Sequence, residues 1–128
     1  MSRGLLDTSI FIAFETGRLV NSNLLPDELA VSVVTIGELQ VGILTAKDAA
    51  AKSKRLKTYR GALRFNPVDI DQQIAEDWAT LRVTLRESGR SVSVNDLWIA
   101  ATALALGVPL VTQDQGLVGL PNIETILV

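Results

Sequence analysis

Short apolar segments alternate with longer amphipathic segments along this chain, and the alternation constrains the fold more than any other feature. The short segments are rich in Leu, Val and Ile, as buried strands of a parallel sheet are. Parallel strands need long crossover connections, which are usually helical. With 128 residues, the chain is long enough for one domain with a sizeable core. We therefore predict an α/β fold in one domain over residues 1–128, with parallel strands joined by helices.

The periodicity of apolar residues predicts where these elements lie. Strands are expected over residues 4–6, 28–34, 66–70, 108–112 and 123–128. Helices are expected over residues 8–15, 35–46, 47–64, 71–88 and 94–107. The last of these helices is nearly all apolar, so we expect it to be deeply buried.

Four acidic residues fall where these elements meet. Asp7 directly follows the first apolar run, and Asp114 follows the run 108–112 after one intervening residue. Glu38 and Asp96 lie in the expected first turns of two helices. In a parallel sheet these junctions share one edge, and ligands bind outside the carboxyl ends of the strands. The four acids are therefore expected to face one another.

Each acid also has a purely structural explanation, because acids are favoured at helix N-termini and in turns. Asp7 could cap the helix after it, and Asp114 could serve a turn before Gly116. The other two acids fit capping boxes, as the pairs Thr35–Glu38 and Ser93–Asp96. Taken singly, either explanation holds about equally well.

Taken together, the four acids favour a cation site. Glu38 and Asp96 are embedded in apolar sequence, where an ionised carboxylate is costly unless it is paired. Converging carboxylates repel, and no lysine lies near any of them in the sequence. The chain has no histidine and no cysteine, so its metal ligands would be oxygens. Oxygen ligands favour Mg²⁺ or Mn²⁺ over Zn²⁺.

The charge of the chain is unevenly distributed. The net charge is −2, yet residues 47–64 carry seven basic residues against Asp48 alone. A basic helix is a candidate for phosphate contact, although a solvated helix face or a site for an acidic partner segment would have the same composition. The candidate nucleic-acid-binding residues are Lys52, Lys54, Arg55, Lys57 and Arg60.

Three stretches of the chain resemble the PIN-domain nucleases, and more narrowly the VapC-type toxins of bacterial type II toxin–antitoxin pairs. The stretches are LLDTSIFIAF, VSVVTIGELQVGI and VNDLWIAATALALGVPLVTQD, which together run over nearly the whole chain. The resemblance places Asp7, Glu38, Asp96 and Asp114, in order, on the acidic quartet of that family. It implies a three-layer α/β/α fold, Mg²⁺ or Mn²⁺ as cofactor, and endonucleolytic cleavage of RNA. It also implies a homodimer and a cognate antitoxin, which together would form a hetero-oligomer.

For such a site we expect Asp7 and Asp96 to be direct metal ligands, and Glu38 and Asp114 to complete the shell directly or through water. One of the latter two would take a proton from the attacking water. Three further residues have side chains that could orient this cluster or only cap and close local structure: Ser9, Asn95 and Thr112.

One departure from the family lies after Thr112. Many relatives carry T-x-D-x-D-F where this chain has TQDQGL, so Gly116 replaces a second acid and an aromatic residue is absent. This departure bears on whether a second metal binds.

Other classes of protein fit less well. Phosphatases with an aspartate nucleophile commonly have a second Asp two residues on, where this chain has Ser9. The adjacent acids and the late lysine of receiver domains are not evident. A catalytically weak protein that acts through partners is the remaining alternative. No apolar run reaches the roughly 20 residues of a membrane span, and no secretion signal is evident, so we expect a cytoplasmic protein.

Overall fold

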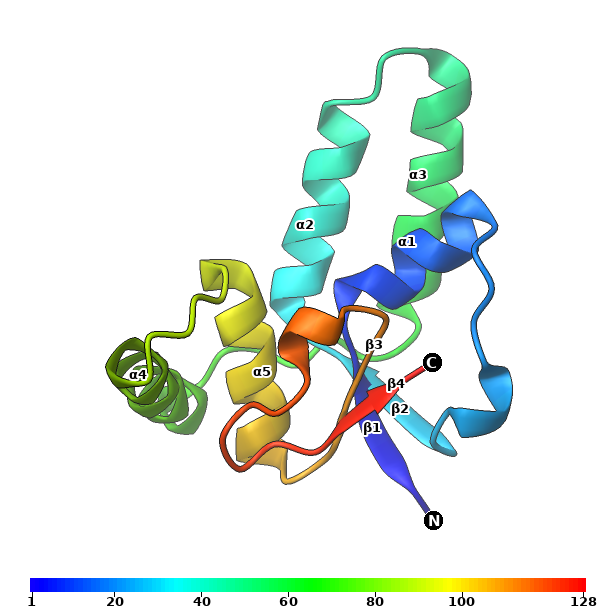
Figure 1. Ribbon diagram of the computed structural model, residues 1–128. Helices are drawn as coiled ribbons and strands as arrows, with labels where there is room; N and C mark the ends of the chain where they lie inside the picture. The colour runs from blue at the N-terminus through cyan, green and yellow to red at the C-terminus, as the bar shows by residue number, and fades with distance from the viewer.

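The computed structural model describes all of residues 1–128 and has a parallel sheet at its centre (Figure 1). The strands lie in the order β2-β1-β3-β4, and each pairs in parallel with its neighbour. The predicted α/β class and the parallel sheet are therefore confirmed. The strands are β1 (Arg3–Leu6), β2 (Glu28–Val31), β3 (Leu110–Thr112) and β4 (Thr125–Leu127).

Five α-helices connect and cover these strands. They are α1 (Thr8–Thr16), α2 (Val33–Leu44), α3 (Ala49–Leu63), α4 (Gln72–Glu87) and α5 (Val94–Leu106). Two short 3-10 helices, η1 (Ser22–Leu24) and η2 (Gln115–Leu117), complete the chain. Each α-helix begins after an Asp or Ser whose side chain accepts a backbone N–H of the first turn, which explains where the helices start. Helices α2 and α3 form a hairpin that rises beyond the sheet (Figure 1).

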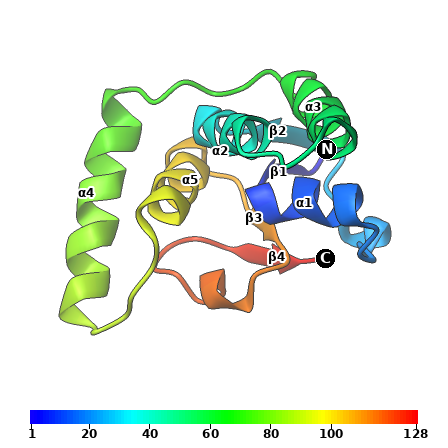
Figure 2. The ribbon, with the colours of Figure 1, turned by 90° about the horizontal axis from the view of Figure 1, so that it is seen from above.

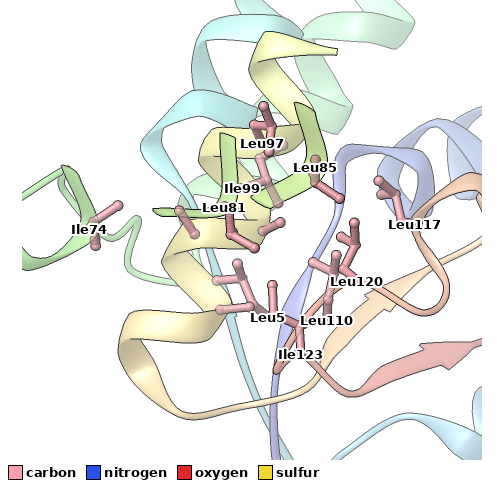
Figure 3. Close-up of a cluster of buried hydrophobic side chains, with 13 residues drawn as sticks. Leu5, Ile74, Leu81, Leu85, Leu97, Ile99, Leu110, Leu117, Leu120 and Ile123 are labelled. Atoms are coloured by element: carbon pink, nitrogen blue, oxygen red, sulfur yellow. The ribbon is translucent and has the colours of Figure 1, made fainter. Parts of the chain in front are cut away.

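The sheet separates two apolar cores, because successive side chains of a strand point to opposite faces. Leu5 of β1 lies in the larger core, which is filled from α4, α5 and the η2 segment (Figure 3). Leu6 lies in the other core with side chains of α1, α2 and α3. Figure 2 shows α1 and α3 on one side of the sheet and α4 and α5 on the other. This arrangement is the expected three-layer α/β/α fold.

Helix α5 is buried as its composition predicts. Ile99, Ala100, Ala101 and Ala103 have no exposed surface. Helix α4 covers its outer side, and Trp78 of α4 stacks on Trp98 of α5 with ring centroids 4.5 Å apart. The small residues of α5 let it lie close against the sheet, so its first turn is held firmly at the sheet edge.

Two predicted boundaries are wrong. Residues 66–70 form no strand, because only Val68 makes a bridge, to Ser32 just after β2, while Pro67 lacks an N–H and Asn66 has a positive φ of 49°. The strand predicted over 28–34 ends at Val31, because the Ser32 hydroxyl caps a helix that begins at Val33. The helix α2 therefore starts two residues earlier than its apolar pattern suggests.

None of the helices combines the length and the apolar character that crossing a membrane requires.

Candidate functional site

Three helices begin at the edge of the sheet where the strands have their carboxyl ends. Helix α1 follows β1 there, α2 follows β2, and α5 starts at the same edge before the chain returns to β3 (Figure 1). Their N-termini carry partial positive charge, which favours nearby carboxylates. The backbone N–H of Asp7 donates to the Val111 carbonyl at 2.8 Å and fixes the acid at this edge.

Asp7 is buried, with 3% of its surface exposed, and only one of its carboxylate oxygens is satisfied. Oδ2 accepts the Thr112 hydroxyl at 2.8 Å and the backbone N–H of Ser9 at 3.4 Å. Oδ1 is buried and has no hydrogen-bond partner. The expected capping role of Asp7 is therefore real, but it uses one oxygen only. A buried carboxylate oxygen without a partner is costly, and a bound cation would satisfy it.

Thr112 links Asp7 to the other end of the site. Its hydroxyl donates to Asp7, so the Ser9 hydroxyl, 3.2 Å away, donates to it, and the N–H of Asp114 does so at 3.0 Å. Ser9 also accepts the N–H of Gln113 at 3.0 Å. The two hydroxyls therefore orient a carboxylate and close local structure at the same time.

Glu38 is held from two other helices. The Thr8 hydroxyl donates to its Oε1 at 2.7 Å, and the Asn95 amide donates to its Oε2 at 3.5 Å. Thr35, which is fully buried, lies 2.8 Å from the Thr8 hydroxyl. The capping box expected for Thr35 and Glu38 is wrong, because Ser32 caps α2 and Glu38 lies in the second turn.

Asp96 lies near the other three acids. Burial raises the pKa of the Asp96 carboxyl, a hydrogen bond with Ser93 lowers it, and the negative charges of Asp7, Glu38 and Asp114 raise it again. Ser93 caps α5, as its spacing to Asp96 predicts. Because Ser93 holds this position, the alternative that Asn95 caps the helix is wrong.

Asp114 lies at the exposed rim of the site and begins η2. Its Oδ1 accepts the N–H of Gly116 at 2.8 Å, so the expected turn is present. A Cβ at position 116 would lie 3.0 Å from that same oxygen. The glycine that replaces the family's second acid thus leaves room for a tight turn around Asp114.

The four acids have no basic counter-charge in the structure. The one ion pair of the chain joins Arg3 and Glu28, at the opposite edge of the sheet. No three acidic side chains stand close enough, as placed, to hold a metal ion together. The unsatisfied oxygen of Asp7 and the raised pKa of Asp96 nevertheless fit a cation between them, and an all-carboxylate donor set suits Mg²⁺ or Mn²⁺.

The basic residues of α3 differ in exposure and in their contacts. Arg55 is half-buried, and its guanidinium donates to the Gly42 carbonyl of α2 at 2.6 Å. Lys52 and Arg60 are exposed. Lys54 and Lys57 are exposed at the rim of a hollow of about 630 Å³ between α1 and α3. The hollow is lined mainly by apolar side chains, including Phe11, Phe14 and Phe65.

Sequence analysis missed Thr8 and Thr35 as neighbours of Glu38. The i, i+3 spacing of Thr35 and Glu38 places both on one face of a helix, and this signal was available. The contact from Thr8 was not, because it depends on how α1 crosses α2.

Comparisons with known proteins agree with the geometry. The family model described as "PIN domain" matches residues 4–121. Two relatives from Mycobacterium tuberculosis are each 44% identical to this chain. The match to Ribonuclease VapC4 covers 98% of this chain and 97% of the relative, and the match to Ribonuclease VapC5 covers 96% of this chain and 91% of the relative. The crystal structure of VapBC-5 from the same organism, a member of the VapBC family of toxin–antitoxin systems, is 40% identical over all of both chains, with a TM-score of 0.91.

Proposed function

This chain belongs to the PIN-domain family, and from that premise we propose that it is a metal-dependent endoribonuclease, the toxin of a type II toxin–antitoxin pair. Two relatives with 44% identity over almost the whole chain are named as ribonucleases, and this supports RNA as the substrate. The structural relative at 40% identity is described as part of a toxin–antitoxin system, which supports an antitoxin as partner. The protein acts in the cytoplasm, and residues 1–128 work as one domain.

The observation that carries this proposal is the unbalanced negative charge at the sheet edge. Asp7 buries a carboxylate oxygen with no partner, the charges of Asp7, Glu38 and Asp114 all act on Asp96, and no basic side chain pairs with any of the four. Asp7 and Asp96 would hold an Mg²⁺ or Mn²⁺ ion, and Glu38 and Asp114 would complete its shell directly or through water. When bound, the cation would lower the pKa of a water and neutralise charge on the phosphate.

The remaining residues of the site have roles that follow from their contacts. Thr112 holds the Asp7 carboxylate by its Oδ2 atom and leaves Oδ1 free for the ligand. Ser9 fixes the Thr112 hydroxyl, and Asn95 restrains the Oε2 atom of Glu38. Glu38 or Asp114 would accept a proton from the attacking water at a carboxylate oxygen.

The basic helix α3 would contact the phosphates of RNA. Lys52, Lys54, Lys57 and Arg60 are exposed and free to do so, whereas Arg55 already ties α3 to α2. The apolar hollow beside Lys54 and Lys57 suits a protein partner better than a phosphate chain. An antitoxin segment that carries both apolar and acidic side chains would match this surface.

The protein forms a homodimer, which also binds the antitoxin. Exposed apolar side chains lie on both α4 and α5, among them Val83 and Leu106 at 50% and 45% exposure, and they are available for contact with a second copy. Analytical ultracentrifugation of the toxin alone measures this state directly. A monomer at micromolar concentration would contradict it.

RNA cleavage by purified, antitoxin-free protein tests the function. Total cellular RNA is incubated with wild type in Mg²⁺, in Mn²⁺ and in EDTA, and with Asp96→Asn prepared identically. We expect cleavage only with a metal and only with Asp96 intact, because the amide is a weaker ligand for a hard cation. Binding of the antitoxin should survive the substitution.

Asp27→Asn is the matched control, because Asp27 is exposed and precedes β2 at the opposite edge of the sheet. It should cleave like wild type. Cleavage in EDTA, or equal cleavage by Asp96→Asn, would refute the assignment of the site. Antitoxin binding without any cleavage would favour a catalytically weak protein that acts through partners.

A further inference from the structure

We propose that Thr8 is a positioning residue that holds the Glu38 carboxylate in its working orientation. The proposal rests on the proposed function, because Glu38 is one of the four acids of that site. Thr8 lies beside Asp7 at the start of α1, while Glu38 lies in α2, so the contact joins two elements of the site.

The direction of the hydrogen bonds supports this role. A threonine hydroxyl has one proton, and that of Thr8 goes to Oε1 of Glu38 over 2.7 Å. The hydroxyl of Thr35, 2.8 Å from Thr8, must then donate to Thr8. A fully buried hydroxyl thus fixes the rotation of a half-buried one, which in turn fixes the acid. Hydrogen bonds that end on a charged group are about twice as strong as those between neutral groups.

Thr8 donates to an acid on another element, and few side chains around the site do so. Asp96 bonds within its own helix cap and Asp114 within its own turn. Only Asp7 and Glu38 receive side-chain hydrogen bonds from other elements, from Thr112 in one case and from Thr8 and Asn95 in the other. The Asn95 bond is long, at 3.5 Å, so Thr8 is the main restraint on Glu38.

A purely structural role would require less of Thr8. To satisfy the buried Thr35 hydroxyl, Thr8 need only accept a hydrogen bond, and its own proton could go to water. In the structure that proton goes to Glu38. The side chain therefore does more than complete the packing between α1 and α2.

Thr8→Val and Thr8→Ser separate the two roles. Valine has the shape of threonine without the hydroxyl, and serine keeps the hydroxyl. We expect Thr8→Val to lower kcat for RNA cleavage by about tenfold to a hundredfold, as loss of a hydrogen bond to a charged group does. The KM for RNA should stay unchanged, since the proposed role of Thr8 is to hold Glu38 and not to bind the phosphates, and Thr8→Ser should restore kcat to within about twofold.

A second readout does not depend on cleavage. Isothermal titration with Mn²⁺ alone, in the absence of RNA, should give weaker binding for Thr8→Val and near wild-type binding for Thr8→Ser. If wild type binds Mn²⁺ but cleaves no RNA, the proposed activity fails while this titration still decides the role of Thr8. Should Thr8→Val fail to fold, Thr8→Ala removes the hydroxyl without adding an apolar branch.

A Glu38→Gln background provides the decisive comparison. If Thr8 acts through Glu38, adding Thr8→Val to Glu38→Gln should lower kcat little further, because the two residues act as a unit. Equal losses in both backgrounds would overturn the proposal. So would wild-type kcat and Mn²⁺ affinity in Thr8→Val, or failure of Thr8→Ser to restore them.

Discussion

Replacing Thr112 with valine tests how the site holds a buried charge without a basic partner. The substitution keeps the shape of the side chain and removes its hydroxyl. That hydroxyl donates to Asp7 at 2.8 Å and accepts from the N–H of Asp114 and from Ser9. After the change, the Asp7 carboxylate would keep only the 3.4 Å bond from the N–H of Ser9. The carboxylate would then be buried and almost without partners.

The expected loss of stability follows from these contacts. A hydrogen bond to a charged group contributes about 1.5–3 kcal/mol, and the N–H of Asp114 and the hydroxyl of Ser9 lose an acceptor as well. We expect Thr112→Val to lower the free energy of unfolding by about 3 kcal/mol. For a domain of this size the midpoint of thermal unfolding should fall by roughly 10 °C. Thr112→Ser removes only a buried methyl group and should cost about 1 kcal/mol.

Urea unfolding in EDTA measures these values without stabilisation by a bound metal. The same change is also made in an Asp7→Asn background, where the buried charge is gone. There Thr112→Val should cost about 1–2 kcal/mol less than in wild type. A cost no larger than that of Thr112→Ser, or one that is undiminished in the Asp7→Asn background, would refute this reasoning.

Three further predictions concern charge and packing. Asp96→Asn should raise the midpoint of thermal unfolding in EDTA near neutral pH, because folding raises the pKa of Asp96 and its ionisation therefore costs stability as the pH rises. Below about pH 4 the carboxyl is protonated in the folded and the unfolded protein, so the gain should vanish there. A gain that persists below this pH would contradict the prediction. Gly4→Ala should lower the free energy of unfolding, measured in urea, by about 1–3 kcal/mol, because the added Cβ would lie 2.8 Å from Pro26 and 2.9 Å from Val111. Gly37→Ala is the control and should not destabilise the protein, because Gly37 in α2 has open space around it. Reversing the charges of Lys54 and Lys57 should weaken RNA binding in a filter-binding assay. The slope of the logarithm of the binding constant against the logarithm of the salt concentration should become shallower by about 1.4, and an unchanged slope would exclude both lysines from the RNA contact.

The sheet edge and its four acids could be predicted from the sequence because two local rules place them. Apolar runs mark the strands, and parallel connections bring the residues after them to one edge. Asp7 lies there for this reason, as does Asp114 after β3. The deep burial of α5 follows equally from its composition, and it carries Asp96 to the same edge.

The start of α2 could not be read from the apolar pattern. Val33 and Val34 continue the β-branched run of the strand before them, so propensity favours a longer strand. The Ser32 hydroxyl, which accepts the N–H of Val34 at 3.0 Å, starts the helix instead. This shift moves Glu38 out of the first turn and removes its capping role.

The side-chain contacts that join separate elements also could not be predicted from the sequence. The sequence leaves two roles open for Asn95 and slightly favours the helix cap over the acids, and only the packing of α5 beside α2 brings it to Glu38. The contact of Thr8 with Glu38 could not be predicted, since nothing in the segment around Thr8 points to a residue 30 positions away. Local patterns thus predict where the four acids lie in the fold, while the side chains that orient them depend on tertiary structure.

Titration of metal-free protein with Mn²⁺ tests the central claim most directly, namely that the acids at the sheet edge hold a divalent cation. Isothermal titration would compare wild type with Asp7→Asn and with the control Asp27→Asn. We predict saturable binding by wild type and by the control, and a loss of affinity of at least about tenfold in Asp7→Asn. Equal binding by all three proteins, or no binding by folded wild type, would contradict this claim. The four acids would then have only structural roles, as helix caps and turn residues.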